Sequence, residues 1–370
     1  MAINRRQFLK SSAVLTAFYC LPSFAQTRPE VEAAIFGKLP TPKDIHRVIS
    51  SGPPSDLLMF ALAPEKMVGF ASISLKKGQT GLFAPQWLEL PVYGRLAGRG
   101  STLSLEQLLS YNPDLIIDTG NIDETYRSQA EKVAKQTHVP YLLIAGGLKD
   151  SPQQLMQLGE ILGVLPQAQQ LSQLAQRYID DAALFAHQNQ QKSLSFYLAR
   201  GAKGLETGAK GSIHTEAIEM LGLRNVVDIP NFHGLTTVSM EQLYQWNPDI
   251  IITQYDEAIE LMTSSALWQG LDAIANRKLL VFSGMPFGWL DGPPGVNRLL
   301  GMRRLQSHFD KNIAMNIKHD IAEFFTRFYH SSLTTQQIDL LMEKSWMMFW
   351  TKRENSFYWS SYYWLALLLR

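Results

Sequence analysis

The chain of 370 residues has almost no cysteine, and its single thiol, Cys20, lies near the N-terminus. If that segment is removed on export, the remaining chain can form neither a disulfide nor a cysteine-based zinc or iron–sulfur site. Positive and negative charges nearly cancel, with a formal net charge of +1. The clustered positive charge that a nucleic-acid-binding protein needs is therefore missing, and we expect no nucleic-acid partner.

Motifs of well-known catalytic sites are also missing. The sequence has no Gly-x-Ser-x-Gly elbow, no His-Glu-x-x-His helix and no phosphate-loop lysine motif. Residues 204–211 are rich in glycine, but their spacing is wrong for a phosphate loop, and we expect these glycines to let the backbone approach a ligand. No cluster of His and carboxylate residues suits a bare metal ion. These absences predict a binding protein and not an enzyme.

The first 25 residues resemble an export signal. Residues 4–10 are similar to the twin-arginine motif, with Asn4 where Ser or Thr is usual. A short apolar stretch follows at 13–21, and residues 23–25 form a small-x-small cleavage site. The stretch is too short to remain as a membrane-spanning helix. We expect cleavage near Ala25 and a periplasmic protein that is exported already folded.

An internal repeat is the most informative positive feature. Residues 104–117 and 239–252 share Ser-x-Glu-Gln-Leu, Asn-Pro-Asp and a final apolar run, with nine of fourteen positions identical. The Ser and the acidic residue predict a capped helix start, and Asn-Pro-Asp ends that helix. The unbroken Leu/Ile run predicts a strand that is covered on both faces. One repeat at so long a spacing indicates a duplicated domain, and therefore two lobes of similar plan.

The remaining pattern predicts an α/β fold with parallel sheets in two Rossmann-like lobes. Residues 151–187 contain few helix breakers and carry leucines at helical intervals, which predicts one long helix between the lobes. A single connecting helix would permit only small relative motion. The expected organisation is an N-terminal lobe at 26–150, a linking helix at 151–187, a C-terminal lobe at 188–343 and an aromatic tail at 344–370.

The aromatic tail differs from the rest of the chain. Its final apolar run is too short to span a membrane. The tail could pack on a lobe, bind a partner, or arise from readthrough or a frameshift. We assign it no function.

Ligands in open α/β sheets bind beyond the carboxyl ends of the strands, and in two-lobed proteins they bind between the lobes. This rule selects loops at 51–55, 93–100, 119–121, 200–212, 231–233, 254–255 and 285–291. The candidate ligand-binding residues in or beside these loops are Ser51, Tyr93, Arg95, Arg99, Asn121, Arg200, His214, His233, Tyr255 and Trp289.

The arginines among these candidates suit an oxygen-rich anion. A guanidinium is always charged and offers a planar set of donors to carboxylate, catecholate or oxyanion oxygens. Arg95 and Arg99 lie in a glycine-flanked loop, where they could also be exposed charges without a ligand. Arg200 directly follows a predicted buried strand, so we expect it at the lip of the cleft.

The other candidates leave two interpretations open. His233 could coordinate a metal or donate to an oxyanion, or it could be an ordinary surface group. His214 lies at the start of a predicted helix, where it could bind the ligand or could equally cap the helix or pack against a neighbour. Tyr93 and Trp289 could stack on an organic chelator at the mouth of the cleft, or they could fill the core.

Together, the two lobes, the linking helix, the repeated motifs and the export signal resemble the class III periplasmic solute-binding proteins, over about residues 45–341. Residues 288–301, Gly-Trp-Leu-Asp-Gly-Pro-Pro-Gly-Val-Asn-Arg-Leu-Leu-Gly, are similar to the branch that handles iron complexes or metal ions, near a molybdate/tungstate-binding member. The resemblance implies a monomer that carries a metal-containing solute to an ABC permease. The solute would be an iron–siderophore type complex, haem, cobalamin, or a molybdate or tungstate oxyanion. No separate cofactor is expected.

Glu106 and Glu241 hold the same place in the two copies of the repeat. In the family that the chain resembles, this glutamate faces the permease and meets arginines there, which implies docking of each lobe on one half of the permease dimer. Capping of the helix by the Glu is the alternative. Two other classes of function stay open: an exported enzyme with a metal cofactor between the lobes, and a structural module that uses the tail.

Overall fold

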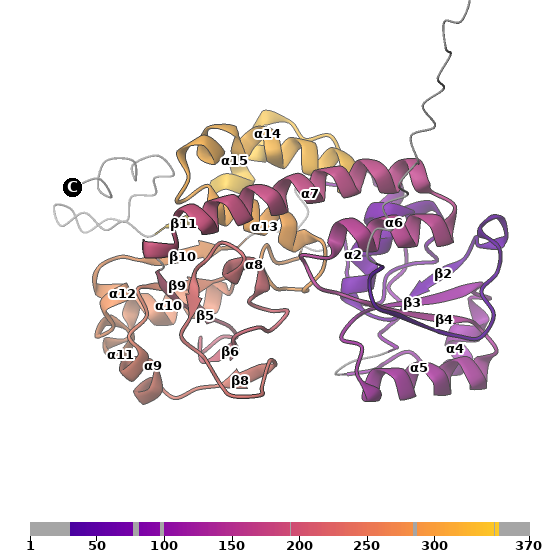
Figure 1. Ribbon diagram of the computed structural model, residues 1–370, viewed down its shortest axis with the longest axis horizontal. Coiled ribbons are helices and arrows are strands. Elements are labelled where there is room, and N and C mark those ends of the chain that lie inside the picture. Colours follow the sequence, from indigo (N-terminus) through magenta and orange to yellow (C-terminus); the bar gives the residue numbers. More distant parts are fainter. Residues whose placement is uncertain are drawn as a thin grey trace, which may run out of the picture.

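The computed structural model describes residues 30–76, 81–96, 100–192, 194–283, 287–343 and 345–347. The predicted export signal, Arg99 and nearly all of the aromatic tail lie outside these described residues. Figure 1 shows two α/β lobes side by side below one long helix, α7, which extends over both. This arrangement confirms the predicted fold class. Within the described residues, no helix is both long enough and apolar enough to cross a membrane.

The N-terminal lobe contains a four-stranded sheet in the order β1-β4-β3-β2. Its strands are β1 (Ala33–Phe36), β2 (Val48–Ser50), β3 (Leu115–Gly120) and β4 (Tyr141–Ala145). The last three are parallel, and β1 pairs antiparallel with β4 at the edge. The apolar segment at 67–71 forms no strand and makes only isolated bridges, at Met67 and Phe70.

Helices cover both faces of this sheet, so its strands are buried as their unbroken apolar runs predict. The helices of the lobe are α2 (Pro53–Leu62), α3 (Pro85–Leu88), α4 (Leu105–Ser110) and α5 (Glu124–Thr137).

The C-terminal lobe contains a five-stranded sheet in the order β11-β10-β9-β5-β7. Four strands are parallel, and β11, the first part of the aromatic tail, pairs antiparallel with β10. The strands are β5 (Ser195–Ala199), β7 (Arg224–Asn225), β9 (Ile250–Thr253), β10 (Leu279–Phe282) and β11 (Ser345–Met347), with a separate hairpin of β6 (Glu206–Gly208) and β8 (Leu235–Thr237).

Five short helices belong to this lobe. They are α8 (Glu216–Glu219), α9 (Met240–Trp246), α10 (Asp256–Ser264), α11 (Ala266–Gln269) and α12 (Asp272–Ala275).

The repeat forms a helix, a turn and a buried strand in each lobe, as α4–β3 and as α9–β9. The hydroxyls of Ser104 and Ser239 accept hydrogen bonds from the backbone N–H three residues later, at 3.1 and 3.2 Å. In the second copy the reciprocal bond comes from Gln242 and not from the Glu. In α9, the capping box is therefore closed by Gln242 and not by Glu241.

The conserved turn of the repeat also has a physical role in each lobe. The asparagines Asn112 and Asn247 adopt left-handed conformations, with φ of 46° and 40°, and end the helices. The aspartates that follow accept hydrogen bonds from the start of the neighbouring strand segment: Asp114 from the N–H groups of His46 and Arg47, and Asp249 from Ser195. The Asn-Pro-Asp turn thus fixes the position of a neighbouring segment of the sheet.

The predicted single linking helix is two helices, α6 (Ser151–Leu162) and α7 (Leu165–Gln188). Gly163 adopts a left-handed conformation with φ of 73°, which ends α6. The chain then reverses, and Gly159 lies so close to Ala168 that a Cβ at this position would clash. Only α7 extends across both lobes (Figure 1).

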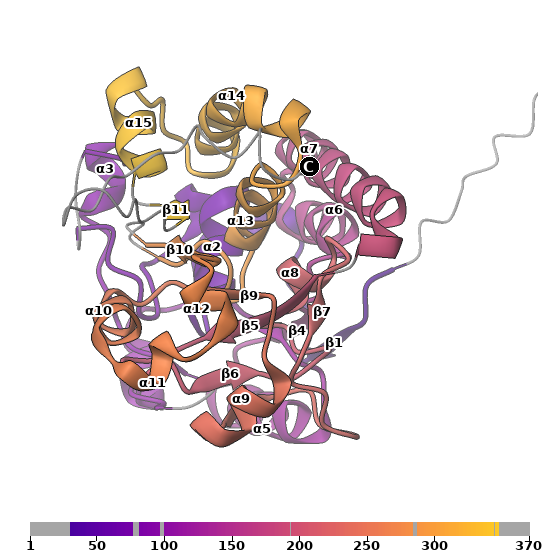
Figure 2. The same ribbon diagram turned by 90° about the vertical axis from the view of Figure 1, so that its left-hand side faces the viewer.

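A second layer of helices joins the lobes besides α7. It consists of α13 (Asn297–Gln306), α14 (Lys311–Phe328) and α15 (Thr335–Glu343), and Figure 2 shows α13 and α14 beside α7, above the sheets. The ring of Tyr329, just after α14, stacks on Phe60 of the N-terminal lobe, with centroids 6.4 Å apart. One continuous apolar core therefore extends through both lobes, which restricts their relative motion more than one helix could.

Candidate functional site

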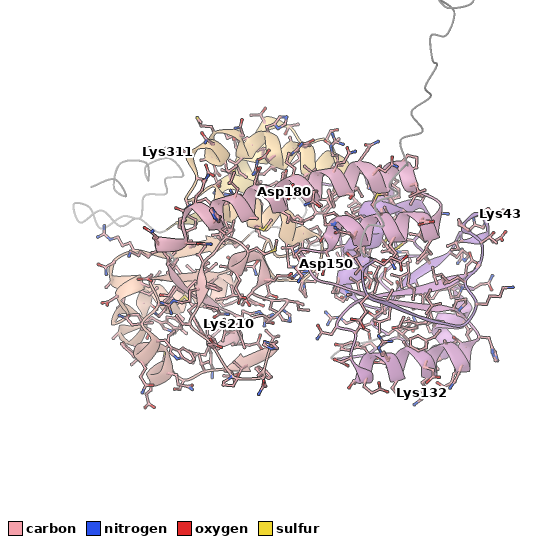
Figure 3. All side chains as sticks on the ribbon, viewed as in Figure 1. Lys43, Lys132, Asp150, Asp180, Lys210 and Lys311 are labelled. Carbon is pink, nitrogen blue, oxygen red and sulfur yellow. The ribbon has the colours of Figure 1, made fainter. Side chains whose placement is uncertain are left out.

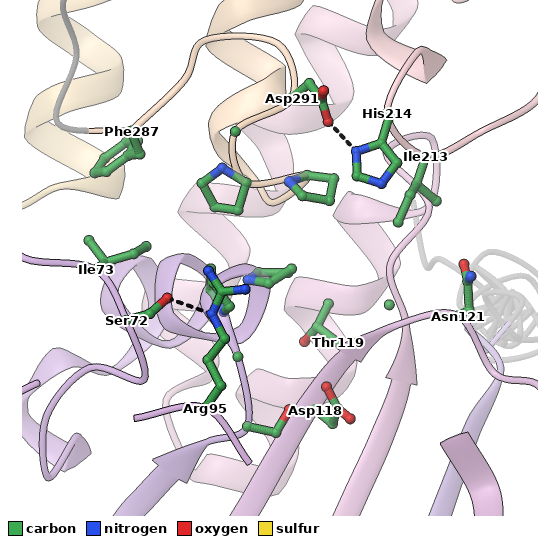
Figure 4. Close-up of a pocket in the computed structure, with 18 of the residues that line it drawn as sticks. Ser72, Ile73, Arg95, Asp118, Thr119, Asn121, Ile213, His214, Phe287 and Asp291 are labelled. Carbon is green, nitrogen blue, oxygen red and sulfur yellow. Dashed lines mark hydrogen bonds and ion pairs between the residues drawn. The ribbon is translucent and has the colours of Figure 1, made fainter. Parts of the chain in front are cut away.

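A cleft of about 530 Å³ lies between the two lobes. Its N-terminal wall comes mainly from residues that follow β2 and β3, and its C-terminal wall from residues that follow β5 and β10. Figure 4 shows the two walls facing each other. The rule that ligand sites lie beyond the carboxyl ends of parallel strands thus locates this cleft correctly.

Five of the predicted ligand-binding residues line the cleft: Ser51, Arg95, Asn121, Arg200 and His214. They come from loops that are far apart in the sequence, three in one lobe and two in the other. The structure therefore brings together half of the predicted set, with charged side chains on both walls.

Tyr93 and Trp289 fill the core and do not lie at the mouth of the cleft. Tyr93 is 4% exposed, and its hydroxyl donates to the carbonyl of Ser50 at 3.0 Å and accepts from the N–H of Ser50 at 2.7 Å. Burial raises the pKa of Tyr93. Trp289 is 1% exposed and donates from Nε1 to the carbonyl of Ser283. The stacking interpretation is wrong for both rings, because neither has a free face.

His233 and Tyr255 do not line the cleft either. His233 is exposed, and its Nδ1 lies 2.8 Å from the carbonyl oxygen of Lys210. Tyr255 precedes α10 and packs against the core of the C-terminal lobe. Burial raises its pKa. Arg99 lies outside the described residues, so its prediction remains untested.

The C-terminal wall is organised around one buried carboxylate, Asp291. Its two oxygens accept hydrogen bonds from Nε of Arg200 and from Nδ1 of His214, and Arg200 also donates to Glu206. Burial acts to lower the pKa of Arg200, but the neighbouring Asp291, Tyr255 and Glu206 raise it above its ordinary value. Arg200 and Asp291 therefore form a fixed ion pair in the wall.

His214 is oriented by this network. Because Nδ1 contacts Asp291, the ring is fixed, and Figure 4 shows the other ring nitrogen turned toward the space between the walls. A histidine held in this way can accept from a ligand, donate to it or coordinate a metal through Nε2.

The N-terminal wall presents a guanidinium that is only partly engaged. Nε of Arg95 donates to the hydroxyl of Ser72 at 3.2 Å, and its two terminal nitrogens have no hydrogen-bond partner among the described residues. Ser72 is held in turn by Asp56, whose carboxylate accepts from the N–H groups of Ala71 and Ser72 at 2.7 and 3.2 Å. Arg95 is thereby positioned with donors available to a ligand.

Buried carboxylates lie behind this wall. Asp118 lines the cleft, is 7% exposed and accepts from the hydroxyl of Tyr141 at 2.9 Å. Burial raises the pKa of Asp118 and raises that of Asp56 to about 7. The hydroxyl of Thr119, also in the lining, is buried without a partner among the described residues. It is one more polar atom that a ligand could satisfy.

Several lining residues were not predicted as ligand-binding residues. Asp118 and Thr119 form the carboxyl end of β3, and Asp291 lies in a selected loop, so the strand-end rule could have identified them. Ser72 directly follows the strand-like segment at 67–71, so the same rule could have pointed to it as well. The lining also contains apolar and aromatic side chains: Pro53, Pro54, Ile73, Tyr126, Ile213, Phe287, Pro293 and Pro294.

Among the described residues, the cleft has no group of His and carboxylate side chains close enough together to hold a bare metal ion. In the described part of the chain, one group of His and carboxylate side chains converges closely enough, His319, Asp320 and Glu323 on α14. Asp320 is paired with Arg303, and Glu323 with Arg177 and Arg327. These carboxylates are already engaged by arginines within the helical layer.

Glu106 and Glu241 lie in the first turns of α4 and α9, and both are exposed. Neither side chain points into the interior of its lobe. In Figure 1, both helices lie on the parts of the lobes away from α7.

Comparison with solved structures finds the same fold in several transport proteins. An ABC transporter solute binding protein from Sulfurospirillum deleyianum is 24% identical, with a TM-score of 0.73 over 82% of this chain and 95% of that one. The Haemophilus influenzae molybdate periplasmic binding protein is 19% identical (TM-score 0.62; 80% and 96% covered), and the vitamin B12 binding protein of Vibrio cholerae is 21% identical (TM-score 0.56; 76% and 99% covered).

A comparison with curated proteins finds no match. Residues 80–283, however, match the family described as periplasmic binding protein, and this match covers more than half of the chain. Two α/β lobes with a polar cleft between them agree with that match. The chain therefore belongs to the periplasmic binding protein family.

Proposed function

We propose that this protein is the solute receptor of an ABC importer and that it captures a metal-containing, oxygen-rich anion between its lobes. Periplasmic binding proteins deliver small ligands to an ABC permease. The observation that carries the proposal is the cleft itself, in which Arg95 faces the network of His214, Asp291 and Arg200. Guanidinium and imidazole donors on opposite walls suit a ligand that both lobes hold at once.

An iron–siderophore type complex is the first candidate for the ligand. The cleft volume of about 530 Å³ lies within the range of roughly 300–1,000 Å³ that is usual for organic ligands. The prolines and Phe287 of the lining offer apolar contact to such a chelate, while Arg95 and His214 address its oxygens. A catecholate or carboxylate chelate has both kinds of surface.

A molybdate or tungstate oxyanion is the second candidate. It is favoured by the structural similarity to the Haemophilus influenzae protein, whose structure contains molybdate. A compact oxyanion would need only a part of the cleft, and the donors of Arg95 and Thr119 on the N-terminal wall could supply hydrogen bonds to it.

Docking through Glu106 and Glu241 completes the proposal. Serine caps both helices, and Gln242 closes the capping box of α9, so the carboxylate of Glu241 is not needed for it. Two exposed acids at equivalent places in a duplicated body suit a permease dimer with an arginine on each half. We also propose a monomeric protein, exported through the twin-arginine signal and cleaved near Ala25.

A ligand panel tests the function directly. The purified protein is titrated with ferric catecholate and hydroxamate chelates, haem, cobalamin, molybdate and tungstate, with sulfate as a control, and the thermal midpoint and bound metal are measured. We expect one class to raise the midpoint, and Arg95→Ala and His214→Ala to reduce this rise. Lys132→Ala, an exposed change on α5, serves as the matched control. Binding that neither cleft variant weakens would contradict the proposal, and so would catalytic turnover.

A further inference from the structure

Arg298, in the first turn of α13, is the most deeply buried arginine of the described residues, at 2% exposure, and it lies near the cleft. Its guanidinium donates to four acceptors: the carbonyls of Gly146 at 2.7 Å, Ile213 at 2.7 Å and Gly295 at 3.0 Å, and the carboxylate of Glu216 at 2.9 Å. The geometry of a planar fork allows one side chain to join this many acceptors.

These acceptors belong to both lobes. Gly146 directly follows β4 of the N-terminal lobe, and its N–H donates to the carbonyl of Gly120, which lines the cleft. Ile213 lies in the C-terminal wall next to His214, and Gly295 ends the proline loop of the lining. One buried cation thus connects three segments that border the ligand site.

Glu216 also connects the two lobes. Its carboxylate pairs with Arg298 and also accepts from the backbone N–H of Leu148, at 2.8 Å, in the segment that leaves the N-terminal lobe. Burial lowers the pKa of Arg298, and Glu216 opposes that effect. Loss of Glu216 would therefore leave a buried charge without its partner and would free the Leu148 segment.

A second arginine on the same helix provides an internal comparison. Arg303 is also buried and paired, with Asp181 at 2.6 Å and Asp320 at 2.7 Å. Its partners lie on α7 and α14, within the helical layer. Arg303 can stabilise that layer, but it contacts neither wall of the cleft, whereas the contacts of Arg298 extend from one wall to the other.

We propose that Arg298 and Glu216 are positioning residues of the ligand site, which fix the angle between the lobes before any ligand binds. The pair holds the segment of Ile213 and His214 at a set distance from the segment of Gly120 and Asn121. Its effect on ligand capture rests on the proposed function, whereas its effect on the arrangement of the lobes does not.

The arrangement of the lobes can be measured in the ligand-free protein. Lys132 on α5 and Glu257 on α10 are exposed and lie in different lobes; Figure 3 labels Lys132. Lys132→Cys and Glu257→Cys can carry spin labels in protein that starts after residue 25, because Cys20 is the only cysteine of the chain. Pulsed electron paramagnetic resonance then gives the distance distribution between the labels.

We expect Glu216→Gln and Arg298→Lys to broaden this distribution and shift its centre, because each removes part of the connection between the lobes. Asp181→Asn, the matched change at the Arg303 pair, should leave it unaltered. If Arg298→Lys does not fold, the distance distribution of Glu216→Gln alone tests the proposal. A wild-type distribution in every folded variant of the pair would overturn the proposal, as would an equal change in Asp181→Asn.

Ligand kinetics separate this proposal from the proposed function. With a ligand from the panel, Glu216→Gln should speed dissociation roughly tenfold and change association much less, since altered interfaces mainly change the dissociation rate. Unchanged dissociation in Glu216→Gln would remove the link to ligand capture. If the wild type binds no ligand of the panel, the proposed function fails, and the label distances still test the role of Arg298 in holding the lobes.

Discussion

The two walls of the cleft hold their buried carboxylates in opposite ways. On the C-terminal wall, Asp291 is paired with Arg200 and His214. On the N-terminal wall, Asp56 and Asp118 have no cationic partner among the described residues, and burial raises the pKa of both. The difference indicates a prebuilt network on one side. On the other side, burial favours the neutral form of both carboxyls, and the terminal nitrogens of Arg95 have no described partner, so its charge is available to an anion.

The largest effect should come from breaking the prebuilt network. Asp291→Ala leaves the buried Arg200 without its main partner, and removal of one member of a buried pair typically costs about 3–5 kcal/mol. We expect a loss of that order in the free energy of unfolding, measured by urea denaturation. Asp228→Ala, which removes an exposed partner of Lys210, should cost far less, because exposed ion pairs contribute little to stability. Equal losses in the two variants would contradict the buried-network interpretation.

The next effect depends on pH and belongs to the N-terminal wall. The pKa of Asp56 is raised from 3.8 to about 7 in the folded protein, so the folded state binds more protons than the unfolded state between about pH 4 and 7. Stability therefore falls as pH rises through this window, by up to about 4 kcal/mol at about 1.4 kcal/mol per unit.

Asp56→Asn should reduce this fall, because the amide does not ionise, while the raised pKa of Asp118 leaves a smaller fall of the same sign. Urea denaturation of both proteins at pH 5, 6 and 8 gives the comparison. A wild-type stability that rises over this range, or an Asp56→Asn variant with the same slope as the wild type, would show that Asp56 is ionised in the folded state.

A smaller effect is expected from the available arginine. Arg95→Ala should weaken ligand binding by about 10- to 100-fold, since hydrogen bonds to charged groups contribute roughly 1.5–3 kcal/mol. Stability should change little, because the side chain of Arg95 has a single described hydrogen bond, to Ser72. Isothermal titration measures the affinity. Arg95→Lys keeps the charge but loses the fork, so an intermediate affinity would show that geometry contributes. An unchanged affinity in Arg95→Ala would show that Arg95 does not recognise the anion and that the C-terminal wall does.

The smallest effect on the receptor itself should follow charge reversal at its two exposed acids. Glu106→Arg and Glu241→Arg should leave stability and ligand affinity within about 0.5 kcal/mol of the wild type, as for most surface changes. Transport in cells should fall with each single reversal and be lost in the double variant. Glu131→Arg, at an exposed acid on α5, is the control. Normal transport by the double variant would exclude docking through these residues.

The sequence was most informative where a local pattern has only one physical outcome. The duplicated helix and strand are confirmed in both lobes, because the Ser cap, the left-handed Asn and the unbroken apolar run act within a few residues of each other. The linking segment was predicted less well. A turn at Gly163 divides it into α6 and α7, and the helical pattern on either side does not reveal that the chain reverses there.

The site was predicted in part, for reasons that particular residues make clear. The strand-end rule found the loops, but it could not say which side chain of a loop faces the cleft. Between Tyr93 and Arg95, Gly94 adopts φ of 105°, so the tyrosine enters the core while the arginine reaches the cleft. Arg298 lies in the motif at 288–301, but the motif did not reveal its role, because its four acceptors come from three separate segments of the chain.

The amino-acid sequence by itself determined the two similar lobes, the buried parallel strands and the exposed places of Glu106 and Glu241, since short-range hydrogen bonding and hydrophobic periodicity are sufficient for these features. Tertiary structure decided which charges meet across the cleft and how the lobes are joined. Such contacts connect residues more than a hundred positions apart, like Arg298 and Gly146, and their geometry depends on the packing of the whole core.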